Sequence, residues 1–167
     1  MVWAICEDSI VANDYDSVFN TVESALTYLL GTKYEYELYA IRQKALDLWR
    51  LECDQPMGLV WSEVNKNDKG APEATLCFRN LSDKKIIAFK VTFTCYDVFG
   101  NVKQSNYDYY YDDEADMDVF ESIVDTWELK GMDGVITIGN IQVTEVVFND
   151  GTKWTRDWNV YSSVYYR

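Results

Sequence analysis

The chain has 167 residues, with 28 Asp and Glu against 15 Lys and Arg, so its formal net charge at pH 7 is −13. A surface this negative repels phosphate backbones and anionic lipids, which argues against direct nucleic-acid binding and favours a basic partner or a cation. The absence of histidine excludes Ser-His-Asp and Cys-His catalysis and most imidazole metal sites, while a hydrophobic content of 48% indicates a folded chain.

The first predicted elements are two helices within residues 1–55. Apolar residues recur at helical spacing in residues 18–30 and again in residues 34–49. Either Asp16 or Ser17 is predicted to cap the start of the first helix. Because two helices cannot bury both of their apolar faces alone, we expect this helical hairpin to pack on the rest of the chain or on a partner.

Residues 58–167 form the second predicted domain, in which the apolar period changes to two. Hairpin turns are predicted at "VFGN", residues 98–101, and at Asp150-Gly151. Along "IIAFKVTFTCYD" the side chains predicted to share one apolar face are Ile87, Phe89, Val91, Phe93 and Cys95. The predicted fold class is therefore α+β, an antiparallel immunoglobulin-like β-sandwich with an N-terminal helical hairpin.

Two stretches carry a resemblance to a known family, "ATLCFRNLSDKKIIAFKVTFTCYDVFGNVK" and "ITIGNIQVTEVVFNDGTKW". A strand that ends in F-x-N precedes a polar turn, a long alternating strand leads into an aromatic-acidic hairpin, and a V-x-F-x-DGT-x-W hairpin closes the pattern. Residues 58–157 thus resemble the small bacterial β-sandwich domains of the FxLYD type and their immunoglobulin-like relatives. The resemblance implies a β-sandwich without catalytic residues, of a kind that often occurs in exported or surface proteins of Gram-positive bacteria.

The most unusual stretch is the acidic segment, residues 108–125, which has eight Asp and Glu side chains and no Lys or Arg. One interpretation is a solvated loop between strands, whose charge protects a sheet edge from aggregation. A second is a calcium site, although the EF-hand pattern fails. Counted from Asp112, the positions that need Gly and Glu hold Met117 and Ile123, and the register that starts at Glu114 fails as well.

A third interpretation is mimicry of nucleic acid, in which carboxylates replace phosphates and neighbouring tyrosines supply stacking faces. In charge and size the chain resembles the small acidic proteins that phages encode to inhibit bacterial defence nucleases, such as anti-CRISPR proteins. The predicted partner is a basic protein surface, such as that of a nucleic-acid-binding protein. The predicted partner-binding residues are Tyr109, Tyr110, Tyr111, Asp112, Asp113, Glu114, Asp116 and Asp118, together with Tyr36, which lies off the apolar face of its helix.

No catalytic group, metal site or cofactor is predicted. The carboxylates crowd into one apparent loop, whereas a glycosidase fixes two of them across a rigid cleft. The four cysteines, Cys6, Cys53, Cys77 and Cys95, form no CxxC pair, and we expect reduced thiols in the core. We therefore expect a binding protein and not an enzyme.

The sequence predicts no membrane span, because no apolar run approaches about eighteen residues. The first residues lack the basic start and apolar stretch of a secretory signal, which predicts a place in the cytoplasm of a bacterial host. The alternative is an accessory β-sandwich module of a bacterial surface or envelope protein, if a signal upstream has been removed. The sequence leaves the oligomeric state open.

Overall fold

The computed structural model describes residues 2–111 and 115–157, and for residues 104–111 it describes the backbone. Three residues of the predicted binding surface lie outside the described residues: Asp112, Asp113 and Glu114.

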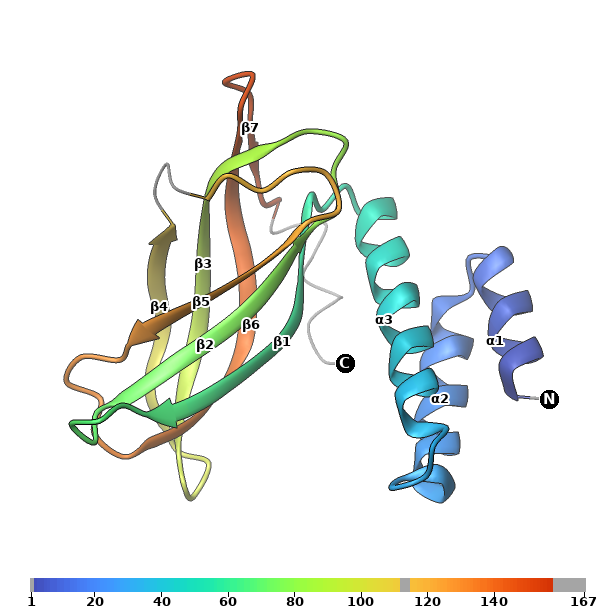
Figure 1. Cartoon of the computed structure of the whole chain (residues 1–167), viewed down its shortest axis with the longest axis horizontal. Helices are drawn as coiled ribbons and strands as arrows, with labels where there is room; N and C mark the ends of the chain where they lie inside the picture. The colour runs from blue at the N-terminus through green and yellow to red at the C-terminus, as the bar shows by residue number, and fades with distance from the viewer. Residues whose placement is uncertain (1, 112–114, 158–167) are drawn as a thin grey trace. The chain divides into compact units, whose positions relative to one another are not determined.

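The chain divides into two compact units, Met1–Asp54 and Gln55–Arg167, which we call the helical unit and the β unit. In its described part the protein is α+β, with three helices in the first unit and two antiparallel sheets in the second (Figure 1).

The helices of the helical unit are α1 (Val2–Val11), α2 (Tyr15–Leu29) and α3 (Glu35–Glu52). The sequence predicts two helices in this part of the chain, and α1 is a third. The predicted cap of α2 was wrong by a few residues: the helix begins at Tyr15, and the side chain of Asp14 accepts a hydrogen bond from the backbone N–H of Ser17 at 3.2 Å. Asp14 thereby satisfies one of the backbone donors that a helix start leaves unpaired.

The helical unit has a small apolar core built from all three helices. On α2 the buried positions are three or four residues apart, as one face of a helix requires. The side chain of Leu38 on α3 is fully buried beneath this face. The buried members of the core are Cys6, Tyr15, Val18, Phe19, Val22, Ala25, Leu38 and Ala45.

The strands of the β unit are β1 (Met57–Lys66), β2 (Pro72–Asn80), β3 (Ile86–Asp97), β4 (Val102–Tyr111), β5 (Ser122–Glu128), β6 (Val135–Phe148) and β7 (Lys153–Thr155). One sheet has the order β1-β2-β5 and the other has the order β4-β3-β6-β7, with every pairing antiparallel. Figure 1 shows the first sheet crossing in front of the second. The predicted hairpin glycines, Gly100 and Gly151, both have positive φ, at 78° and 80°.

The two sheets bury their inner faces in a single apolar cluster. The rings of Phe78 from β2 and Phe89 from β3 meet across it, with centroids 5.4 Å apart. The predicted apolar face of β3 was wrong at its first position, because Ile86 is fully buried and Ile87 is not. The register between β3 and β6 shifts between Ile86 and Ala88, and such an irregularity moves the alternation of side chains by one residue.

Candidate binding surface on the acidic segment

The acidic segment is not the single loop that the sequence analysis assumed. Residues 109–111 belong to β4, where the backbones of Tyr109, Tyr110 and Tyr111 pair with Val91, Lys90 and Phe89 of β3. Aromatic side chains favour extended backbone, so the tyrosines continue a strand and do not begin a loop. The segment ends in a second strand, β5, which the sequence analysis missed and which begins at Ser122.

Between these strands, two buried apolar side chains fix the described part of the segment to the core of the β unit. Ala115 and Met117 have exposed fractions of 0% and 1%. The backbones of Met117 and Ile86 exchange two hydrogen bonds, both 3.0 Å long. Because buried and exposed residues alternate here, Asp116 and Asp118 are directed to solvent on either side of Met117.

A buried asparagine at the end of β2 also binds the backbone of this part of the acidic segment through hydrogen bonds. The amide nitrogen of Asn80 donates to the carbonyl oxygens of Met117 at 3.3 Å and Asp118 at 3.1 Å. Its backbone N–H donates to the carbonyl of Glu121 at 2.9 Å. Asn80 is fully buried, and a buried polar group whose hydrogen bonds are made orders its surroundings. This asparagine is the last residue of the F-x-N pattern seen in the sequence.

The carboxylates of Asp116 and Asp118 share one cation. Lys85 forms ion pairs with Asp116 and, at 3.3 Å, with Asp118. The hydrogen bond from Lys85 to Asp116, and to a lesser extent the one to Asp118, raises the pKa of the Lys85 ammonium group. Both carboxylates remain open to solvent, with exposed fractions of 75% and 74%. Two negative charges on one positive charge leave a net negative charge here, so this part of the segment can still attract a basic surface.

The segment turns sharply before β5, and its tip is apolar. The backbone N–H of Asp118 donates to the Glu121 carboxylate at 2.8 Å, and the N–H of Glu121 donates back to the Asp118 carbonyl at 3.1 Å. Between them, Val119 and Phe120 are 43% and 68% exposed. Phe120 has a φ of 61°, in the left-handed region that a bulky side chain rarely adopts. Neither residue is among the predicted binding residues, which are acidic side chains and tyrosines.

Of the predicted site residues, the structure brings Asp116 and Asp118 together on Lys85. It places the backbones of residues 109–111 on β4, next to β3. Tyr36 is 83% exposed on α3 and belongs to the other compact unit. The residues that sequence reasoning missed are Asn80, Lys85, Val119 and Phe120.

Among the side chains that the structure describes, those of residues 2–103 and 115–157, no three from His, Cys, Asp or Glu are grouped so that they could hold a metal ion. All four cysteines are free thiols. Burial raises the pKa of Cys95 to about 11, and burial also raises the pKa of Cys6, Cys53 and Cys77. Thiols of this kind stay protonated near pH 7, and the protonated form is a poor nucleophile.

Among the helices of the described residues, none combines the length and the apolar composition needed to cross a membrane.

Comparison with known proteins finds one similar solved structure and no known family. No protein family matches the sequence, and neither does any curated protein. The chain is similar to a hypothetical protein from Peptoclostridium difficile 630 whose structure was solved by X-ray crystallography, with 15% sequence identity and a TM-score of 0.48. That likeness covers 67% of this chain and 92% of the other. A likeness at this level carries no argument about function.

Proposed function

We propose that this protein is a non-enzymatic, acidic binding protein that acts in the cytoplasm of a bacterial host. Its acidic segment occupies a basic surface that otherwise receives nucleic acid, in the manner of a phage-encoded, anti-CRISPR-like inhibitor. The observation that carries the proposal is that Asp116 and Asp118 are about three-quarters exposed while Met117 between them is buried. The carboxylates are therefore presented on a backbone that is already ordered.

Order in the free protein favours binding, because a flexible acidic loop would lose conformational entropy on association. Asn80 and Ile86 hold the backbone at Met117 and Asp118 before any partner arrives. The charge of the whole chain, −13, would speed the encounter with a basic surface, and salt would weaken that effect.

The apolar tip supports a protein partner over a simple cation. Val119 and Phe120 are exposed beside carboxylates, and aromatic side chains at the centre of an interface often carry much of the binding energy. A bulky residue with positive φ costs about 1–2 kcal/mol. Such strain tends to persist where a side chain has a use in recognition.

We further propose that the β unit is an immunoglobulin-like sandwich and that α2 and α3 form the predicted helical hairpin. In immunoglobulin-type sandwiches, strands A, B and E share one sheet and strands C, F and G share the other, which a further strand C′ can join. If β1 to β7 are lettered A, B, C, C′, E, F and G, the two sheets read A-B-E and C′-C-F-G. A crystal structure with β5 beside β6 would contradict this assignment.

The experiment that tests the binding proposal is an affinity pull-down from bacterial lysate at about 50 mM and about 200 mM salt. Three baits of the full chain are compared: the wild type, a segment-neutral variant and a charge-matched control variant. The segment-neutral variant carries Asp112→Asn, Asp113→Asn, Glu114→Gln, Asp116→Asn and Asp118→Asn. The control variant carries the same number of neutral substitutions at exposed sites elsewhere: Asp54→Asn, Glu63→Gln, Asp68→Asn, Asp83→Asn and Asp133→Asn.

We expect the wild type and the control variant to recover the same nucleic-acid-binding protein at low salt, and the segment-neutral variant to lose it. Recovery should fall as salt rises, since the attraction is between charges. Equal recovery by all three baits, equal loss in both variants, or no nucleic-acid-binding protein at all would refute the proposal.

A further inference from the structure

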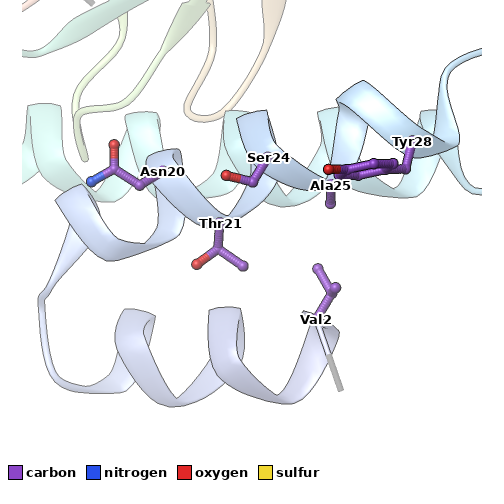
Figure 2. A pocket seen from close by; sticks show the side chains of 6 residues that line it. All are labelled: Val2, Asn20, Thr21, Ser24, Ala25 and Tyr28. Carbon is purple, nitrogen blue, oxygen red and sulfur yellow. The ribbon is translucent and has the colours of Figure 1, made fainter.

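The helical unit has an open groove between α1 and α2, separate from the acidic segment. Its volume is about 470 Å³, and its lining residues are Val2, Asn20, Thr21, Ser24, Ala25 and Tyr28. In Figure 2, Val2 rises from α1 and Thr21 points from α2 into the space between the two helices.

The groove exists because small side chains on α2 line it where α1 passes. Ala25 is 8% exposed and belongs to the core, whereas Ser24 beside it is exposed. Tyr28, one turn further along α2, is 85% exposed and offers a large apolar face. Residues four apart lie on one face of a helix. A row of small residues beside a large exposed aromatic ring leaves room for the ridge of a third helix.

The two helices that form the groove carry charge of one sign only. Residues 2–32, which include α1 and α2, contain no Lys or Arg. Their charged side chains are all acidic and all exposed: Glu7, Asp8, Asp14, Asp16 and Glu23. The residues that line the groove are themselves uncharged. An uncharged groove with acidic residues on the helices that form it complements a helix with one apolar face and basic flanks.

We propose that this groove binds a basic amphipathic helix of a partner protein. The apolar face of that helix, with residues at i, i+3 or i+4 and i+7, lies along Val2, Ala25 and Tyr28, and its Lys and Arg side chains face the carboxylates of α1 and α2. A second copy of this chain is a poorer occupant, because a two-fold contact would place two surfaces of the same negative charge against each other.

The test uses the full chain and a synthetic peptide of about 18 residues, with Leu along one helical face and Lys on the others. A second peptide of the same composition has its order scrambled so that no apolar face forms. Binding is measured by isothermal titration calorimetry at about 150 mM salt, where long-range attraction is screened. The protein variants are Ser24→Arg, which fills and charges the groove, and Ala40→Arg, which makes the same charge change at an exposed site on α3.

We expect the amphipathic peptide to bind the wild type at least about tenfold more tightly than the scrambled peptide. Ser24→Arg should weaken this binding at least about tenfold, and Ala40→Arg by less than about twofold. The segment-neutral variant should bind the peptide as the wild type does, which separates this inference from the proposed function.

Four results would overturn the inference. They are the absence of binding, equal affinity for both peptides, equal losses in Ser24→Arg and Ala40→Arg, or loss in the segment-neutral variant alone. Light scattering coupled to size-exclusion chromatography checks the other occupant: a dimer of the wild type that Ser24→Arg converts to a monomer would assign the groove to a second copy of the chain.

Discussion

The two units differ in the size of the apolar core and in how their acidic residues are arranged beside it. In the described residues of the β unit, eighteen buried apolar side chains form one cluster, and the acidic segment is attached to it through Ala115 and Met117. In those of the helical unit, eight buried side chains form the core, and the acidic residues of α1 and α2 accompany an uncharged groove. The two proposals therefore assign recognition to ordered carboxylates in the β unit and to an uncharged groove between acidic helices in the helical unit.

The largest expected effect is the loss of unfolding free energy when a buried side chain is removed from the core of one unit. Phe93 of β3 is 1% exposed, so Phe93→Ala should cost the β unit about 3–5 kcal/mol of unfolding free energy. Because the units are separately compact, the helical unit of Phe93→Ala should unfold at the same urea concentration as in the wild type, as followed by the α-helical circular-dichroism signal. Leu38→Ala is the matched control, with a cost of about 2–5 kcal/mol to the helical unit. If either substitution shifts both transitions equally, the units are not independent.

The next effect tests the attachment of the acidic segment. Met117→Ala removes a side chain that is 1% exposed and should cost about 2–5 kcal/mol. Since the amide of Ile86 donates to the Met117 carbonyl at 3.0 Å, hydrogen exchange at Ile86 should accelerate by more than the global loss of stability requires. Val119→Ala is the control, because Val119 is 43% exposed and its loss should cost below about 1 kcal/mol. Equal costs for the two variants would mean that the segment is not anchored through Met117.

A smaller effect, with the opposite sign, is expected at the tip of the segment. Asn tolerates positive φ far better than Phe, and Phe120 is 68% exposed, so little apolar burial is lost. Phe120→Asn should therefore raise the unfolding free energy by about 1 kcal/mol, measured by urea denaturation. Phe120→Ala lacks the short polar side chain whose local hydrogen bonds let Asn adopt this φ, and it should give no such gain. Both variants should bind the recovered partner less tightly, and a stabilised variant with unchanged binding would remove Phe120 from the binding surface.

The smallest effect is a dependence on pH at the β6–β7 hairpin. Lys84 donates to the Asp150 carboxylate at 2.8 Å, and this bond, with those from Thr152, lowers the pKa of Asp150 from its ordinary value of 3.8. Because the folded-state pKa is depressed, the stabilisation is complete above the ordinary pKa and is lost as the pH falls through the folded pKa. The melting temperature of Asp150→Asn should thus lie below that of the wild type at pH 7. The gap should close below about pH 4, and a gap that stays constant into acid would contradict the pairing.

Much of the β unit could be predicted because local chemistry decides it. The hairpins at Gly100 and Gly151 have turn residues that require positive φ, and β1 and β3 alternate between apolar and polar residues. By contrast, β5 was missed because Asp125 interrupts the apolar positions Ile123 and Trp127, which pack against the core. A partly buried charge on an edge strand opposes pairing with other chains. The same charge breaks the alternation of apolar and polar residues by which a strand is predicted.

The helical unit was predicted less completely for a different reason. The first helix spans only 10 residues, and its pattern of Val2, Trp3, Cys6 and Ile10 was present in the sequence but short. At the candidate site, the acidic residues could be predicted from the sequence, but the hydrogen bonds that order their backbone could not. Asn80 lies 37 residues from Met117 along the chain, and no local pattern predicts that its amide will hold that backbone.

The measurement that tests the central claim most directly is a competition on the partner recovered with the wild-type chain. Its affinity for this protein is measured by fluorescence anisotropy, with and without excess of the nucleic acid that it binds. The account predicts that nucleic acid displaces the protein, and that the segment-neutral variant binds at least about tenfold more weakly than the charge-matched control. A stable complex of all three components, or equal weakening in both variants, would contradict the claim that the acidic segment takes the place of nucleic acid.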